Sequence, residues 1–256
     1  MTFISSLAGL ITGLVLGVFG SGGGIITTPA LLYLAHVPAK SAIAMSLGVI
    51  AITATVATLQ HWRRGNVDFR VTVIFGLFSM AGTYLGARLG VDTPVVVQLA
   101  VFSLVMYAAA WKMLRPLPVH RSVGAAAVSP ELCVTPRCMF RTGAVGVAVG
   151  MLAGLVGVGG GFLIVPALVL LSGLSIKQAI GTALAIVTLN SASGFLGYAG
   201  HVSINYTLVG TFSALAIAGS VLGAYLAHRL SANHLKRAFG VFLLFAASAI
   251  LLKSVL

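Results

Sequence analysis

The chain contains one stretch of sequence twice, as GLVLGVFGSGGG at residues 13–24 and as GMLAGLVGVGGG at residues 150–161. Each copy is followed at the same distance by Pro-Ala-Leu, which begins at Pro29 and at Pro166. The copies are 137 residues apart, since 150 − 13 = 137 and 166 − 29 = 137. A missed internal repeat misassigns a whole fold. We therefore interpret the chain first as a duplication.

The same register continues through most of both halves, with one two-residue gap. The further matches are Lys40 with Lys177, Leu47 with Leu184, and Gly82, Gly86 and Ala87 with Gly219, Gly223 and Ala224. We expect a first transmembrane repeat at residues 1–114, a polar linker at residues 115–140, and a second transmembrane repeat at residues 141–256.

Composition places these repeats in a membrane. Hydrophobic residues make up 59% of the chain and charged residues 7%, against about a quarter charged in soluble domains. The mean hydropathy is +1.11. Apolar runs of roughly 17–25 residues match the thickness of a bilayer core. We expect an all-α integral membrane protein with five apolar segments per half. The segments are 3–19, 22–35, 41–60, 71–87 and 94–111, then 142–157, 159–172, 178–198, 206–227 and 238–252.

The N-terminal segment is expected to stay in the mature protein. A cleavable signal peptide opens with a basic stretch and ends in a small-residue cleavage site. No lysine or arginine precedes residues 3–19. We therefore interpret this segment as the first membrane helix.

Charge placement predicts the topology. Of the fifteen lysines and arginines, twelve lie in the odd-numbered connections and three, Lys40, Arg88 and Lys253, in the even ones and the tail. The positive-inside rule then places the odd connections and the linker in the cytoplasm. Both termini should face the periplasm of a bacterium, with the protein in the inner membrane. The net charge of +12 thus reflects orientation rather than nucleic-acid binding.

An odd number of segments per half implies that the halves have opposite orientations. Matched connections support this. The connection after residues 41–60 carries Arg63, Arg64 and Arg70, whereas its mate around His201 carries no lysine or arginine. Such an exchange of charge is typical of inverted repeats.

The second segment of each half is too short to cross the membrane comfortably. Residues 22–35 would form about 21 Å of helix, against a hydrocarbon core of about 30 Å. Glycine runs precede both short segments, at residues 20–24 (the first tip) and 157–161 (the second tip). Consecutive glycines disfavour a helix, so we expect irregular turns within the membrane. Whether the short segments cross fully or are re-entrant stays open.

Interrupted segments in matching positions of inverted halves indicate a transporter's binding site. Free N–H groups at a helix start suit an anion, and glycine lets a ligand approach the backbone. The tips should therefore face each other and form one site. The candidate substrate-binding residues of the tips are Ser21, Gly22, Gly23, Gly24, Gly159, Gly160 and Gly161.

Polar side chains on the following segments complete the candidate site. They are Ser46 on residues 41–60, and Thr182 and Asn190 on residues 178–198. A helix–helix hydrogen bond is the alternative role for Asn190. Glycines spaced by four are assigned to helix packing instead. These are Gly9, Gly13 and Gly17, with Gly146, Gly150 and Gly154.

Ionisable chemistry within the membrane has little support. Asp68, Asp92 and Glu131 are the only acidic residues, and all map to connections, so no carboxylate is expected for a proton relay or cation site. Cys133 and Cys138 lack further ligands nearby for a metal. We expect no cofactor, no metal site and no enzyme activity.

The doubled glycine tip with Pro-Ala-Leu, the Lys-x3-Gly-Thr at residues 177–182 and the Gly-x3-Gly-Ala at residues 82–87 and 219–224 resemble the TauE/SafE sulfite exporter (TSUP) family. The resemblance covers both halves. It implies a carrier that moves sulfite, thiosulfate or an organosulfonate such as sulfoacetate across the bacterial inner membrane. The first half has Ala-Met-Ser at residues 44–46 where the second has Gly-Thr-Ala at 181–183, so the two half-sites differ.

The expected function is a secondary transporter for small sulfur-containing anions, in which one half rocks against the other to alternate access. The expected partners are the anion and membrane lipid; a homodimer stays open, and nucleic acid is excluded. An anion channel could use the same residues. An intramembrane hydrolase with Ser21 as nucleophile is disfavoured, because the base it needs has no candidate histidine at that depth.

Overall fold

The computed structural model describes residues 3–19, 23–114, 136–157, 159–161, 164–165, 168, 174, 176–229, 241, 244–245 and 247–248. All regular structure within these residues is helical. Most of the expected segments at 159–172 and 238–252 lie outside the described residues.

The described helices follow the expected segments. They are α1 (Phe3–Phe19), α2 (Gly23–Tyr33), α3 (Ala39–Arg63), α4 (Phe69–Asp92), α5 (Val95–Leu114), α6 (Pro136–Val156), α8 (Ile176–Tyr198) and α9 (Tyr206–Arg229). Several helices are longer than their apolar runs, and α6 begins inside the stretch assigned to the linker. An apolar run marks the part of a helix within the hydrocarbon, whereas the helix itself continues into the polar interface. Asp68 begins α4 as its N-cap, because its carboxylate accepts a 3.0 Å hydrogen bond from the Val71 N–H.

Four stretches within the described helices are long and apolar enough to cross a membrane: Ala39–Arg63, Phe69–Asp92, Gln178–Tyr198 and Tyr206–Leu226. Shorter apolar helices occur at Leu7–Val18 and Gly143–Val156. The all-helical class and the membrane assignment from composition agree with this architecture.

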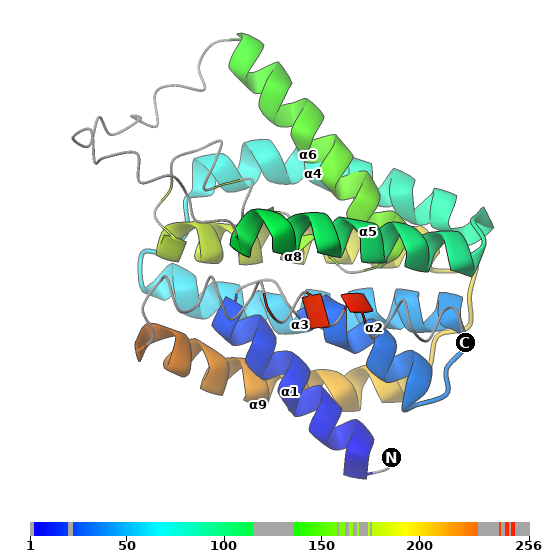
Figure 1. The fold of residues 1–256 in the computed structure, drawn as a ribbon. Coiled ribbons are helices and arrows are strands. Elements are labelled where there is room, and N and C mark those ends of the chain that lie inside the picture. Colours follow the sequence, from blue (N-terminus) through cyan, green and yellow to red (C-terminus); the bar gives the residue numbers. More distant parts are fainter. Residues whose placement is uncertain are drawn as a thin grey trace.

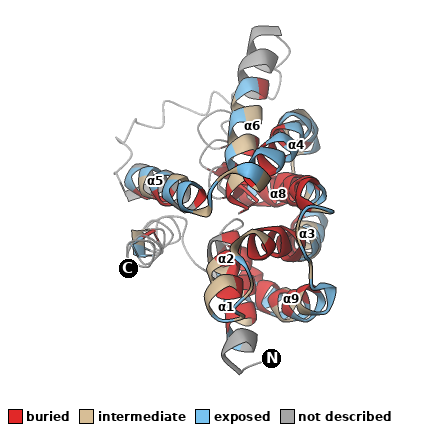
Figure 2. Cartoon of the chain, turned by 90° about the vertical axis from the view of Figure 1, so that its right-hand side faces the viewer, coloured by how far each residue is buried: buried red, intermediate tan, exposed pale blue. Residues whose placement is uncertain are grey.

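The helices form two groups that do not follow the sequence halves (Figure 1). One group, here the α3 bundle, contains α1, α2, α3 and α9; the other, the α8 bundle, contains α4, α6 and α8 (Figure 2). The two bundles meet mainly along α3 and α8. Each bundle therefore includes one helix from the opposite half of the chain, α9 in the α3 bundle and α4 in the α8 bundle.

Glycines hold the crossing helices of each bundle in backbone contact. A Cβ at Gly13 of α1 would overlap the Ala216 carbonyl of α9, and a Cβ at Gly150 of α6 would overlap the Ser79 carbonyl of α4. These contacts are equivalent with the halves exchanged, since 150 − 13 = 137 and 216 − 79 = 137. Gly17 on Ser220 and Gly154 on Thr83 repeat the relation. The packing role predicted for these glycines is confirmed.

The equivalent helices α3 and α8 run in opposite directions. Gly194, near the end of α8, packs on Leu47 in the first half of α3, whereas Gly181, near the start of α8, packs on His61 at the end of α3. By contrast, α1 runs parallel to α9, because Gly9 and Gly17 meet Leu215 and Ser220 in the same order.

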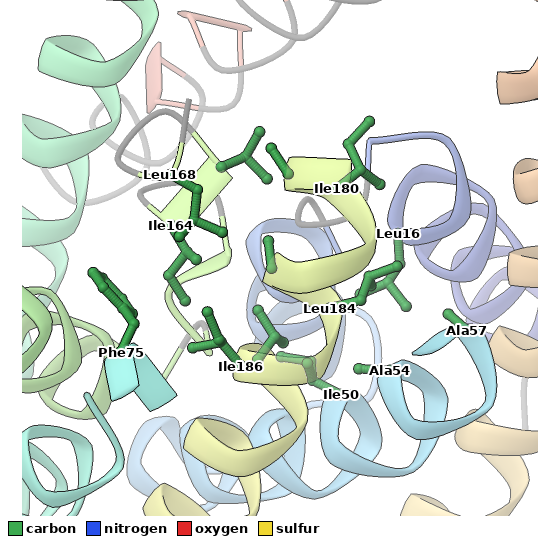
Figure 3. Packing of buried hydrophobic residues seen from close by; sticks show 14 of the residues in the cluster. Leu16, Ile50, Ala54, Ala57, Phe75, Ile164, Leu168, Ile180, Leu184 and Ile186 are labelled. Atoms are coloured by element: carbon green, nitrogen blue, oxygen red, sulfur yellow. The ribbon is translucent and has the colours of Figure 1, made fainter. Parts of the chain in front are cut away.

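An apolar core fills the junction between the bundles (Figure 3). Ile50 of α3 and Leu184 and Ile186 of α8 are almost fully buried in it, together with Phe75 of α4 and Ile164 just beyond the second tip. This core fixes the second tip against the central helices.

Candidate substrate-binding site

The second tip is an irregular turn, as the glycine run predicts. Gly157, Gly159 and Gly160 have φ values of 75°, 68° and 70°, in the left-handed region that other L-residues avoid. The Gly157 N–H donates to the Ala153 carbonyl over 2.9 Å and closes α6. The Gly160 carbonyl accepts from the Ile164 N–H over 3.1 Å, so helical bonding resumes after the turn. Gly161 is buried.

The first tip is described only from its last two residues. Ser21 and Gly22 lie outside the described residues. Gly23 begins α2 and packs on α1, where an added Cβ would lie 2.6 Å from Leu16 Cδ1. Gly24 is buried beside it.

Gly159 brings the backbone of the second tip against a serine hydroxyl of α8. A Cβ on Gly159 would lie 2.5 Å from Ser191 Oγ and 3.3 Å from Ile50 Cγ2. Ser191 is fully buried, and its hydroxyl has no hydrogen-bond partner among the described residues. Glycine is needed here both for the backbone conformation and for this close approach.

Asn190 lies beside Ser191 on α8 and is also fully buried. Its Nδ2 donates to Ser79 Oγ of α4 over 2.6 Å, so the helix–helix hydrogen bond considered for this residue is present. Its Oδ1 has no partner in the described part of the chain. The amide is therefore only half used by the protein.

Ser46 contacts the second tip from α3. Its Oγ donates to the Gly157 carbonyl over 2.7 Å and to the Ile43 carbonyl over 2.8 Å, and it accepts from Thr28 Oγ1 over 2.9 Å. Thr28 also approaches the Gly157 carbonyl, at 3.4 Å. The Ser46 proton is thus engaged with carbonyl oxygens in this conformation.

Thr182 lies away from the second tip. Its Oγ1 accepts from the Asp68 N–H over 3.0 Å, and the neighbouring Gly181 packs on the backbone of Asn66. At 1.5 Å per residue, Thr182 is about 13 Å from Ser191 along α8. The structure therefore groups Ser46, Asn190 and Gly159 near the second tip and places Thr182 at the connection between α3 and α4.

Sequence reasoning did not select several polar residues that the structure brings to this region. Ser191, Ser79 and Thr28 are buried there. A signal was present, because each is a hydroxyl inside an apolar segment. The sequence could not show which of them would keep an unused hydrogen-bonding group.

The electrostatics near the second tip come from neutral groups. The described contacts of Gly157, Gly159 and Gly160 are with serine, threonine, alanine and aliphatic side chains. Charged residues lie instead at the helix ends, where Arg88 Nη1 donates to His201 Nε2 over 2.8 Å and Lys40 donates to the Val91 carbonyl. Any anion at the second tip would therefore rely on N–H and O–H dipoles.

Comparison with known proteins agrees with a transport site. The chain matches the family model described as sulfite exporter TauE/SafE over residues 5–250. A probable membrane transporter protein of Xylella fastidiosa (strain Temecula1 / ATCC 700964) is 34% identical over 96% of this chain and 94% of its own length. The probable membrane transporter protein YdhB of Bacillus subtilis (strain 168) is 26% identical over 83% of each chain.

A more distant relative, the probable membrane transporter protein MJ0441 of Methanocaldococcus jannaschii, is 25% identical over 90% of this chain and 88% of its own. No solved structure matches the chain. The family and the names of these relatives indicate membrane transporters rather than enzymes. This chain belongs to the TauE/SafE sulfite exporter family and is a multi-pass membrane protein.

Proposed function

We propose that this protein is a secondary transporter for a small sulfur-containing anion: sulfite, thiosulfate or an organosulfonate such as sulfoacetate. One observation carries the proposal. The left-handed glycines of the second tip bring an exposed stretch of backbone against Ser191, whose buried hydroxyl is unused. A polar, uncharged surface of this kind at the centre of an apolar core has no evident structural purpose.

The chemistry of the region suits a small oxyanion. Such an anion needs several donors at hydrogen-bond distance, and backbone N–H groups supply them where no side chain intervenes. The first N–H groups of α2, which begins at Gly23, have no partner within that helix and add a partial positive charge. A buried lysine or arginine would be costly at this depth, so neutral donors are the economical solution.

The proposal includes an inverted repeat of residues 1–114 and 141–256 joined by a cytoplasmic linker, with ten segments in all. Two observations support it. The glycine contacts recur 137 residues apart with the halves exchanged, and α3 and α8 run antiparallel. Equivalent helices that run in opposite directions are expected when the axis relating the halves lies in the membrane plane.

Alternating access would then move bundles rather than sequence halves. Rocking one half against the other would break the backbone contacts of α1 with α9 and of α4 with α6, which have no slack because glycine Cα atoms meet carbonyls directly. The junction of α3 with α8 is packed by side chains and includes the hydroxyl contact of Thr58 with Thr188 at 3.4 Å. We therefore place the sliding surface between the α3 bundle and the α8 bundle.

Uptake into proteoliposomes tests the proposal. Sulfite, thiosulfate and sulfoacetate should be compared with sulfate and phosphate as substrates. Saturable uptake of at least one sulfur-containing substrate, lost in Gly159→Val, is the expected result. Flux that does not saturate and shows single-channel steps would assign the protein to the channels instead, and the absence of any flux of these anions would overturn the proposal.

A further inference from the structure

Two buried polar atoms of opposite character lie unused beside the second tip. The Asn190 amide is oriented by its 2.6 Å hydrogen bond from Nδ2 to Ser79 Oγ. This bond leaves Oδ1, a pure acceptor, without a donor among the described residues. The adjacent Ser191 offers a hydroxyl that can donate and likewise has no partner there. Both residues are 0% exposed.

Both residues are tied to the same region by their neighbours. Ser191 lies against Gly159 of the second tip. Asn190 is bonded to Ser79, and the backbone of Ser79 packs directly on Gly150 in α6, the helix that leads into the tip. The acceptor and the donor thus occupy one turn of α8 where α6 ends.

The other half of the chain has no equivalent pair. The matching positions, 137 residues earlier, are Thr53 and Ala54. The Thr53 hydroxyl donates to the Val49 carbonyl of its own helix over 2.7 Å, and Ala54 has no polar side-chain atom. The two half-sites are therefore chemically unequal, and the donor–acceptor pair belongs to α8 alone.

A fully deprotonated oxyanion cannot satisfy this pair. Its oxygens can accept from Ser191, but they repel the Asn190 Oδ1, and a buried acceptor without a donor costs about 1–3 kcal/mol. A ligand that carries its own N–H or O–H group satisfies both atoms. Selectivity of this kind arises because a polar site is left unpaired when the ligand lacks the matching group.

Building on the proposed function, we propose that the site selects sulfur oxyanions that carry a hydrogen-bond donor: a hydrogen-sulfite-type monoanion or an amino- or hydroxy-substituted sulfonate. Asn190 Oδ1 accepts from the donor of the substrate, and Ser191 Oγ donates to one of its sulfonyl oxygens. Asn190 is then the specificity-determining residue, and Ser191 a general contact to the anion.

Sulfamate and methanesulfonate form a matched pair of probes. Both are monoanions of nearly the same shape, and they differ in an NH2 group against a CH3 group next to sulfur. Binding to the purified protein in detergent, measured by calorimetry, should favour sulfamate by about tenfold, the ratio expected for about 1.4 kcal/mol. In Asn190→Leu this preference should disappear. In Ser191→Ala both affinities should fall while their ratio stays the same.

Thr53→Val is the control, because it changes the matching position of the other half, whose hydroxyl is already used within α3. It should keep the wild-type preference. Equal affinity for the two probes in the wild-type protein, while thiosulfate or sulfite binds, would overturn the inference and leave the proposed function standing. Failure of every sulfur oxyanion to bind would overturn the proposed function itself. Since Ser191→Ala removes no protein hydrogen bond, it tests the anion contact even if Asn190→Leu does not fold.

Discussion

Ser46 Oγ donates to the Gly157 carbonyl over 2.7 Å and thereby joins the α3 bundle to the second tip. Thr28 supports this contact from α2. The positions that match Ser46 and Thr28 in the other half are Ala183 and Val165, which have no hydroxyl. The bundles are therefore held together by hydrogen bonds at the second tip through groups that the other half lacks.

The combined variant Ser46→Ala, Thr28→Val should loosen this junction. Hydrogen bonds between membrane helices contribute about 0.6 kcal/mol on average, so two or three of them correspond to an about tenfold change in the open population. A cysteine at Ile43, which packs on Gly157, should be alkylated correspondingly faster in a background without Cys133 and Cys138. The variant Thr55→Val is the control, because Thr55 bonds only within its own helix. An unchanged alkylation rate would show that these hydroxyls do not hold the bundles together.

Crosslinks should distinguish movement of the bundles from movement of the halves. Cysteines at Thr58 and Thr188, whose hydroxyls lie 3.4 Å apart across the bundle junction, should arrest transport when oxidised. Cysteines at Gly9 and Leu215 join α1 to α9 within one bundle but across the two halves, with a Cβ separation of 3.2 Å, close to disulfide geometry. That second crosslink should leave transport intact. Arrest by the Gly9–Leu215 crosslink and not by the Thr58–Thr188 crosslink would instead favour rocking of the halves.

Glycines of the second tip and glycines of the helix crossings should respond differently to substitution. Gly159→Ala adds a Cβ 2.5 Å from Ser191 Oγ at a φ of 68° and should abolish binding of sulfite and thiosulfate, at a strain cost of about 1–2 kcal/mol. Gly13→Ala places a Cβ in the backbone of α9 and should reduce the folded yield instead. Gly210→Ala meets nothing within 4 Å and should change neither property. Normal binding by folded Gly159→Ala would remove the second tip from the site.

The proposed orientation can be read from two labelling sites. Cys133, in the linker, should react with an impermeant thiol reagent only from the cytoplasmic side. A single cysteine at Ser203, an exposed position bonded to Ser41 at the start of α3, should react only from the periplasmic side. The same accessible side for both positions would contradict the topology derived from the positive charges.

Much of the local structure could be predicted from the sequence. The bounds of α1 were predicted to the residue, and the second tip was placed at the glycines that prove to have positive φ. The reasons are local: an uninterrupted apolar run defines a membrane helix, and consecutive glycines interrupt one. The ends of α3 and α4 were missed, because apolarity stops at the interface and helical hydrogen bonding does not.

The pairing of the helices could not be predicted in the same way. In a lipid-exposed protein every face of a helix is apolar, so hydrophobicity does not reveal which neighbour a helix packs against. The glycine spacing showed that α1 and α6 pack closely, but not that their partners are α9 and α4. The fate of polar groups was equally hidden: Thr182 bonds to Asp68, whereas Ser191 bonds to nothing described.

The exchange of α4 and α9 between the bundles has a consequence for synthesis. When α4 first enters the membrane, Gly82 and Gly86 have no partner, because the carbonyls that they contact, those of Val147 and Met151, belong to a helix not yet translated. A polypeptide released after Leu114 would retain an unfilled groove along α4 and an α1 without α9. The nascent chain must therefore keep its first four helices loosely associated until its later helices arrive. Premature release should yield a product that membrane proteases recognise.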